Sequence, residues 1–109
     1  MGKASPDVVR TVEEFKKSVW RKYGIRKIIL FGSQATGKSK KHSDVDLIVV
    51  SKKFAGKRAF NGVIKLSREW HNKKNNYPVD FLCYSPKEFD RLRKRITIVK
   101  QAVEEGIEI

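Results

Sequence analysis

Apolar residues recur along this chain with two different periods, which predict a series of helices and strands. In the first segment they are three or four residues apart, a spacing that places side chains on one face of an α-helix. The members of this stripe are Val8, Val12, Phe15, Val19 and Tyr23. Ser5 and Pro6 suit the first turn of such a helix, and Gly24 suits its end. The pattern therefore predicts an amphipathic helix over residues 6–23.

Three shorter runs are almost continuously apolar, and their lengths are typical of β-strands. They span about residues 26–31, 44–50 and 78–84. Helical spacing returns over residues 57–71. The side chains expected to face inward from this helix are Phe60, Val63 or Ile64, Leu66 or Ser67, and Trp70.

The last quarter of the chain predicts two more helical segments. Ser85 and Pro86 are suited to begin one of them, and the other covers about residues 97–105 and ends at Gly106. The resulting order, αββαβα, predicts an α+β fold with a small mixed sheet, helices packed against one of its faces, and the first two strands as antiparallel neighbours. We expect residues 1–109 to form a single domain, because this length is near the commonest domain size.

The ends of the first two predicted strands carry the most informative chemistry. The first strand runs into Gly32 and Ser33, and the second opens with Asp44 and Asp46. Strand residues two apart point to the same side of a sheet, so these two carboxylates are expected to emerge together. Paired carboxylates repel each other, and a hard cation such as Mg²⁺ neutralises them. Asp80, in the third apolar run, adds a third carboxylate, so the set predicts a phosphoryl- or nucleotidyl-transfer site.

The chain is strongly basic. It has 25 lysine and arginine residues against 12 acidic residues, which gives a formal net charge of +13. This charge favours polyanions such as nucleotide triphosphates, RNA or an acidic protein surface, and it equally suits a lysine-rich surface that keeps a small protein soluble. Because the sequence has no apolar run near the roughly 20 residues of a membrane span, and Cys83 is its single cysteine, we expect a cytoplasmic protein.

Gly32, Ser33, Asp44, Asp46 and Asp80 together resemble the site pattern of the nucleotidyltransferase superfamily that includes DNA polymerase β. That pattern is Gly-Ser, a spacer of about ten residues, Asp-x-Asp, and a later acid within an apolar strand. The resemblance is closest to the small stand-alone members called minimal nucleotidyltransferases, and it covers nearly the whole chain.

This resemblance implies a transfer reaction assisted by two Mg²⁺ ions, with Mn²⁺ as an alternative ion and ATP as the substrate. Asp44 and Asp46 would share both ions, and Asp80 would complete the ion beside the attacking hydroxyl. All three are thus the expected catalytic and metal-binding residues. Metal binding needs ionised carboxylates, so activity should fall in acid.

The Gly-Ser turn and the spacer after it supply the expected triphosphate contacts. Gly32 lets the backbone approach a phosphate because it has no side chain. Ser33 would donate its hydroxyl to the β- or γ-phosphate, and Lys38 would be one of several cations of the loop. Many relatives carry Arg directly after Gly-Ser, where this chain has Gln34, so the chain departs from the family's pattern at one expected triphosphate contact.

A second motif overlaps the same turn. Residues 32–39 fit the P-loop string G-x-x-x-x-G-K-[ST], which requires a helix that starts at the Lys-Ser pair and points at the phosphates. Residues 40–43 carry no apolar positions at helical spacing, and the next strand follows too soon for a crossover of about a dozen residues. The sequence therefore favours a nucleotidyltransferase over a P-loop protein.

The resemblance also bears on what receives the nucleotide. Minimal nucleotidyltransferases are often paired with small helical HEPN-type proteins in prokaryotic toxin–antitoxin systems, where the transferase is the antitoxin and attaches AMP to a tyrosine of the toxin. Protein adenylylation is therefore the implied reaction. Two alternatives are a transferase that acts on RNA ends or a small molecule, and a catalytically degenerate, basic nucleotide- or RNA-binding module. The three aspartates argue against the degenerate module, because binding alone does not need three converging carboxylates.

Overall fold

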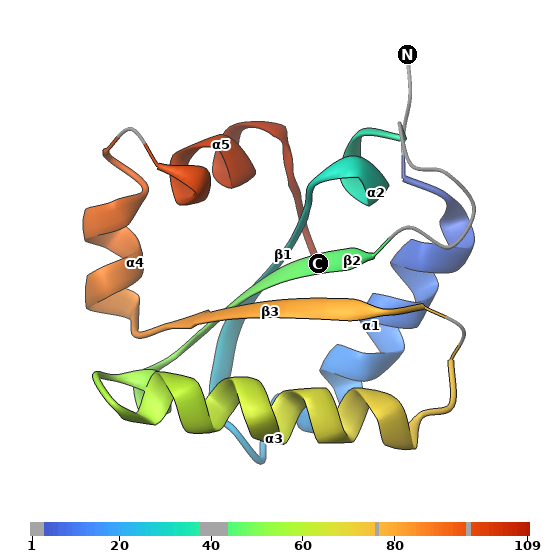
Figure 1. Ribbon diagram of the computed structural model, residues 1–109, viewed down its shortest axis with the longest axis horizontal. Helices are drawn as coiled ribbons and strands as arrows, with labels where there is room; N and C mark the ends of the chain where they lie inside the picture. The colour runs from blue at the N-terminus through green and yellow to red at the C-terminus, as the bar shows by residue number, and fades with distance from the viewer. Residues whose placement is uncertain (1–3, 38–43, 76, 96) are drawn as a thin grey trace.

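The computed structural model describes residues 4–37, 44–75, 77–95 and 97–109. Figure 1 shows how its elements are arranged. The helices and strands are α1 (Pro6–Val19), β1 (Ile25–Phe31), α2 (Ser33–Thr36), β2 (Val45–Ser51), the 3₁₀ turn η1 (Lys52–Phe54), α3 (Arg58–Asn72), β3 (Val79–Tyr84), α4 (Pro86–Leu92), α5 (Ile98–Glu105) and β4 (Ile107–Glu108). The predicted helices and strands are present, and α2 and β4 are additional.

Hydroxyl side chains define where three of the helices begin. Ser5, Ser85 and Thr97 each accept a hydrogen bond from the backbone N–H three residues later, at 3.2 to 3.3 Å. This cap satisfies an N–H group that the first helical turn leaves unpaired. α1 ends at Val19, and Tyr23 lies in the turn that follows instead of in the helix. No helix within the described residues is long and apolar enough to span a membrane.

The four strands form one mixed sheet in the order β3-β2-β1-β4. β1 and β2 are antiparallel neighbours, as predicted. β3 lies parallel to β2, which precedes it in the chain with η1 and α3 between them. β4 pairs antiparallel with β1 at the other edge. With two residues, β4 is too short to give an alternating pattern, so the sequence did not indicate it.

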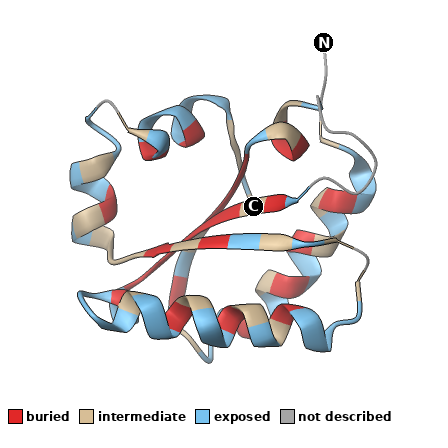
Figure 2. Cartoon of the chain, in the orientation of Figure 1, coloured by how far each residue is buried: buried red, intermediate tan, exposed pale blue. Residues whose placement is uncertain are grey.

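Helices cover both faces of this sheet, whereas the sequence predicted helices on one face. On the face of α1 and α3, the buried cluster includes Val12, Leu30 and Trp70. On the face of α4 and α5, a separate cluster includes Ile48 and Phe89. The physical reason is that β1 and β2 are apolar at successive positions, so both of their faces need cover. Figure 2 shows buried residues along much of both strands.

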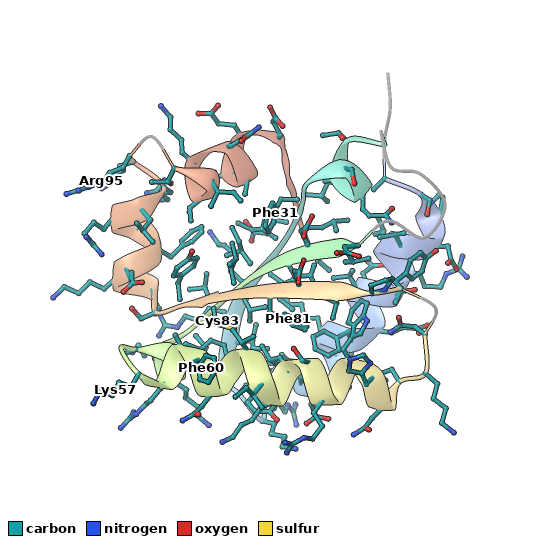
Figure 3. The ribbon with its side chains drawn as sticks, viewed as in Figure 1. Phe31, Lys57, Phe60, Phe81, Cys83 and Arg95 are labelled. Atoms are coloured by element: carbon teal, nitrogen blue, oxygen red, sulfur yellow. The ribbon has the colours of Figure 1, made fainter. Side chains whose placement is uncertain are left out.

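Three aromatic rings join α1, α3 and β3 on the first face. The ring centroid of Phe15 lies 5.1 Å from that of Trp70 and 5.6 Å from that of Phe81. The indole N–H of Trp70 donates to the backbone carbonyl of Tyr77 at 2.8 Å, so its polar atom is satisfied. Figure 3 shows Phe81 and Cys83 on the side of β3 that faces α3. Trp70 therefore faces inward, as predicted.

The prediction that Phe60 faces inward is wrong, because its side chain is 70% exposed. The buried residues of α3 are Gly62, Leu66 and Trp70, and position 60 lies about 200° around the helix from position 62. A Cβ at Gly62 would lie 2.7 Å from the ring of Phe54. Phe54 of η1 thus occupies the space next to the sheet that Phe60 was expected to fill.

Candidate functional site

β1 and β2 bring the predicted Gly-Ser turn and the predicted aspartates to the same end of the sheet. Phe31, the last residue of β1, pairs with Asp46 near the start of β2. Gly32 and Ser33 follow Phe31 directly, and Ser33 begins α2. The turn therefore lies beside Asp46, as the spacing of the two motifs predicted.

Gly32 meets two structural requirements at this position. Its φ angle is +76°, a backbone conformation that residues with a side chain rarely adopt. A Cβ built on it would also overlap the carboxylate oxygen Oδ2 of Asp46. The sequence indicated a glycine that admits a phosphate. The structure adds that this glycine leaves room for the Asp46 side chain.

β3 places Asp80 directly beside Asp46. The two strands are parallel, and Asp46 and Asp80 are partners in their register. Because side chains alternate along a strand, both aspartates share the sheet face of Ile48 and Leu82, which α4 and α5 cover farther along. Asp46 is half-buried and Asp80 is exposed. The fold thus joins two acids that are separated in the chain by the whole of α3.

The charges of the other two predicted carboxylates act on Asp46. Burial raises the pKa of Asp46, and the negative charges of Asp80 and then of Asp44 raise this pKa further. Asp44 directly precedes β2 and is exposed. All three acids therefore contribute to one region of negative potential. A cation bound there would favour the ionised form of Asp46 and offset the repulsion.

The donor chemistry of this region fits a magnesium ion that is bound together with a phosphate ligand. In the part of the chain that the structure describes, no three His, Cys, Asp or Glu side chains form a ready-made metal site. Mg²⁺, however, commonly takes one or two carboxylates and completes its shell with water and substrate phosphates. Asp46 and Asp80, which are partners in the strand register, meet that smaller requirement.

A cavity of about 450 Å³ adjoins these carboxylates. The ends of β1, β2 and β3 form one wall and α5 forms the other. Its lining residues are Phe31, Gly32, Asp46, Asp80, Phe81, Leu82, Ile98, Gln101, Ala102 and Glu105. The volume lies within the range of about 300 to 1,000 Å³ that is typical of small-molecule sites. The cavity therefore offers apolar surface for a ligand directly beside the acids.

Gln101 and Glu105 line this cavity but were not predicted as site residues. They are four residues apart on α5 and therefore share one face of that helix, with Ile98 one turn earlier. Helical periodicity could have grouped these three residues. It could not have shown that α5 packs against β1, which is a tertiary contact between segments far apart in the chain.

The residues after Gly32 form the short helix α2, where the sequence predicted a polar loop. Ser33 is half-exposed at its first position, and its backbone carbonyl accepts a hydrogen bond from the Gly37 N–H. Gln34 is only 5% exposed, so the residue that replaces the expected Arg is buried and does not extend into solvent. Lys38, the other predicted triphosphate contact, lies outside the described residues.

The pairing of β1 with β2 excludes the P-loop interpretation. In a P-loop, the strand leads through the glycine-rich loop into a helix that begins at the Lys-Ser pair. Here α2 begins at Ser33, within the string itself, and the next strand is the antiparallel neighbour of β1. The Gly-Ser turn therefore belongs to a connection between antiparallel strands, which is the arrangement that the spacing of the aspartates predicted.

Comparison with known proteins agrees with this geometry. A family model described as a nucleotidyltransferase domain matches residues 12–104, which include the Gly-Ser turn and all three aspartates. A crystal structure from Sulfolobus solfataricus, assigned as a nucleotidyltransferase, has a TM-score of 0.63 and 21% sequence identity, and the match covers 99% of this chain and 89% of that one. At this identity the likeness shows a shared fold. No curated protein matches the chain significantly.

Proposed function

Because this chain belongs to the nucleotidyltransferase domain family, we propose that it uses Mg²⁺ to transfer AMP from ATP to a hydroxyl group of a partner protein. Nucleotidyl transfer is the general activity that the family indicates. The observation that carries the more specific proposal is the pairing of Asp46 with Asp80 next to the Gly32 turn. A structural role alone does not explain a half-buried carboxylate whose pKa is raised by burial and by the charge of an adjacent carboxylate.

The three aspartates are the proposed metal ligands. Asp46 is central, because it is the strand partner of Asp80 and is affected by the charge of Asp44. Bound Mg²⁺ would neutralise the triphosphate and lower the pKa of the attacking hydroxyl. Asp80 is exposed, so an acceptor can approach it, and we assign it to the acceptor's side of the reaction.

The transfer itself is a displacement at phosphorus. The acceptor's hydroxyl oxygen forms a bond to the α-phosphorus of ATP, and the bond from that phosphorus to the oxygen bridging to the β-phosphate breaks. Pyrophosphate leaves with the electron pair of the broken bond, and the hydroxyl proton passes by way of Asp80 to solvent. The chain's part is to hold the reacting groups in line and to neutralise their charges.

The remaining residues of the site position the nucleotide. We assign the half-exposed hydroxyl of Ser33 to the β- or γ-phosphate, because it follows Gly32 at the edge of the cavity. The nucleoside then occupies the cavity between the strands and α5, against Phe31 and Ile98. The side-chain amide of Gln101 can donate to and accept from a base edge in that cavity.

The acceptor is proposed from the resemblance to minimal nucleotidyltransferases. By that resemblance it is a tyrosine of a small helical HEPN-type protein, and the chain acts as the antitoxin of a toxin–antitoxin pair. The net charge of +13 supports an encounter with an acidic partner surface, which would be faster at low salt. The same charge favours the second candidate, transfer to the end of an RNA.

Intact-mass spectrometry tests the proposal and separates the two acceptors. The protein is incubated with ATP, Mg²⁺ and the purified product of the neighbouring reading frame. We expect an AMP-sized mass increment on that product, and its loss with the Asp46→Asn variant. Asp90→Asn is the matched control, because Asp90 is an exposed acid on α4 that pairs with Arg93. Lengthening of an added RNA without any change of protein mass would support the second candidate instead.

A further inference from the structure

A second and larger cavity, of about 840 Å³, lies at the end of the sheet opposite the carboxylates. We call it the basic groove. Its walls are the turn before β1, the turn η1 after β2, and one face of α3, and its lining residues are Lys22, Tyr23, Lys53, Phe54, Arg58, Asn61, Gly62, Lys65, Arg68, Glu69 and Asn72. β2 leads from Asp46 to η1, so at about 3.3 Å per residue the η1 wall of the groove lies roughly 20 Å from Asp46.

The described residues that line the groove carry a large excess of positive charge. Five of them are basic and one, Glu69, is acidic. Glu69 already accepts hydrogen bonds from the Lys22 ammonium at 2.8 Å and from the Tyr23 hydroxyl at 3.0 Å. Within the described part of the chain, Lys65 and Arg68 form no ion pair with an acid. Their charges are therefore directed at solvent or at a ligand.

The polar side chains of the groove form a row along α3. Arg58, Asn61, Lys65, Arg68 and Asn72 are separated by three or four residues, so they follow one face of the helix. The 15 residues of α3 extend over about 20 Å at 1.5 Å per residue. Hydrogen-bond donors spread over that length suit an extended polyanion better than a compact one.

We propose that the basic groove binds the sugar–phosphate backbone of a nucleic acid strand, as a site separate from the proposed transferase site. Interfaces with nucleic acids are much more positively charged than those between proteins. The cores of protein–protein interfaces are instead depleted of lysine and built around exposed aromatic or apolar anchors. Of the aromatic residues in the groove, Phe54 is buried and Tyr23 is half-buried, with its hydroxyl bonded to Glu69. The charge and the side-chain chemistry of the groove therefore fit a nucleic acid better than a protein partner.

The same observations predict how the groove binds. Since most of its solvent-facing groups are cations and amides and its rings are buried or half-buried, it contacts phosphates instead of stacking on bases. Binding is therefore independent of base sequence. Its affinity falls steeply as salt rises, because binding releases the counterions that are condensed on the phosphates. Because α3 covers one face of the sheet and Asp46 and Asp80 lie on the other face, Mg²⁺–ATP does not compete for the groove.

Fluorescence anisotropy with a short, labelled oligouridylate tests this proposal. Affinity is measured between about 50 and about 200 mM salt for the full chain and for the double variant Lys65→Ala/Arg68→Ala, both of whose residues are exposed. Each lost phosphate contact lowers the slope of log affinity against log salt by about 0.7 on a single strand, so we expect a fall of about 1.4. The matched control is Arg91→Ala/Arg95→Ala, which removes the same charge. Arg91 is on α4, which packs on the other face of the sheet, and Figure 3 shows Arg95 projecting outward.

Each result either supports the groove or overturns it. A loss of affinity and slope confined to the Lys65→Ala/Arg68→Ala variant supports it, and unchanged binding or an equal loss in the control overturns it. Displacement of the RNA by polyglutamate at an equal concentration of charge would overturn the assignment of a nucleic acid as the ligand and would favour an acidic protein. The Asp46→Asn variant separates this inference from the proposed function. RNA binding should persist in that variant, so the groove can stand even if the chain transfers no AMP.

Discussion

The two ends of the sheet carry opposite charges, and the structure tolerates them in different ways. At the end where β1 leads into Gly32, burial and then the charges of Asp80 and Asp44 raise the pKa of Asp46, so the ionised carboxylate disfavours the fold until a cation binds. At the end of the basic groove, the acid Glu69 is paired and Lys65 and Arg68 are exposed to water. Like charges are inexpensive where they are solvated and costly where they are partly buried. The partly buried aspartates are therefore a stronger indication of a catalytic site than the solvated cations are.

The largest expected effect is loss of transfer on removal of the paired carboxylates. Asp46→Asn and Asp80→Asn each keep the shape of the side chain but remove a metal-binding charge. Because changes to residues that only support a metal ligand already cost about 10- to 100-fold, we expect a fall of at least about 100-fold in kcat/KM. Transfer assays at saturating Mg²⁺ provide the measurement. Full activity of Asp80→Asn would show that this residue is only structural.

A smaller effect is expected at the Gly32 turn. Gly32→Ala places a side chain at a φ of +76° and a ψ of −158°, a region essentially restricted to glycine, which costs about 1–3 kcal/mol of unfolding free energy, and it also displaces the Asp46 carboxylate. Gly56→Ala is the matched control, because Gly56 has a φ of +57° and nothing within 4 Å of its would-be Cβ. Denaturant unfolding and transfer assays compare the two variants. Equal losses of activity would mean that Gly32 does not position Asp46.

The cavity wall on α5 should contribute less. Gln101→Ala removes one side-chain amide from the proposed nucleoside site, and a hydrogen bond contributes about 0.5–1.5 kcal/mol. We therefore expect KM for ATP to rise by about 2- to 10-fold with little change in kcat. Lys100→Ala serves as the control, because Lys100 is exposed on the same helix and is not part of the cavity lining. A kcat that falls while KM stays constant would contradict a role in nucleoside binding.

The smallest effect is on stability in the absence of metal. The pKa of Asp46 is raised in the folded state, so its contribution to stability is fully present below the unfolded pKa and is lost as pH rises through the folded pKa. Asn cannot ionise, so Asp46→Asn removes this loss of stability at higher pH. The metal-free variant should therefore melt a few degrees higher than the wild type at neutral pH. The difference should vanish in strong acid. Thermal unfolding across the pH range provides the measurement, and a variant that melts lower at neutral pH would contradict it.

Local pattern was enough to predict the longer helices and strands of this fold, but not the short elements α2 and β4 or the tertiary placement of the elements. The stripe from Val8 to Val19 and the three apolar runs have periods that fix the type of element. The spacing of Gly32 and Asp46 likewise predicted that the turn and the aspartate lie side by side. The orientation predicted for Phe60 was wrong because Phe54, which lies outside the helix, occupies the space beside Gly62.

The parts of the site that could not be predicted depend on contacts between distant segments. Gln101 reaches the cavity because α5 packs against β1, and Lys22 meets Lys65 at one groove because α1 and α3 cover the same sheet face. Neither contact leaves a periodic signal in the chain. The role of Lys38 stays a prediction, since it lies outside the described residues.

The central claim is that the carboxylates bind a metal together with a nucleotide triphosphate, and calorimetric titration of ATP with and without Mg²⁺ tests it most directly. For the wild-type protein we expect ATP to bind tightly only when Mg²⁺ is present, because Asp46 and Asp80 otherwise repel the phosphates. Asp46→Asn should remove this dependence on Mg²⁺. ATP binding that is equally strong without Mg²⁺, and unchanged in Asp46→Asn, would contradict the assignment of the site.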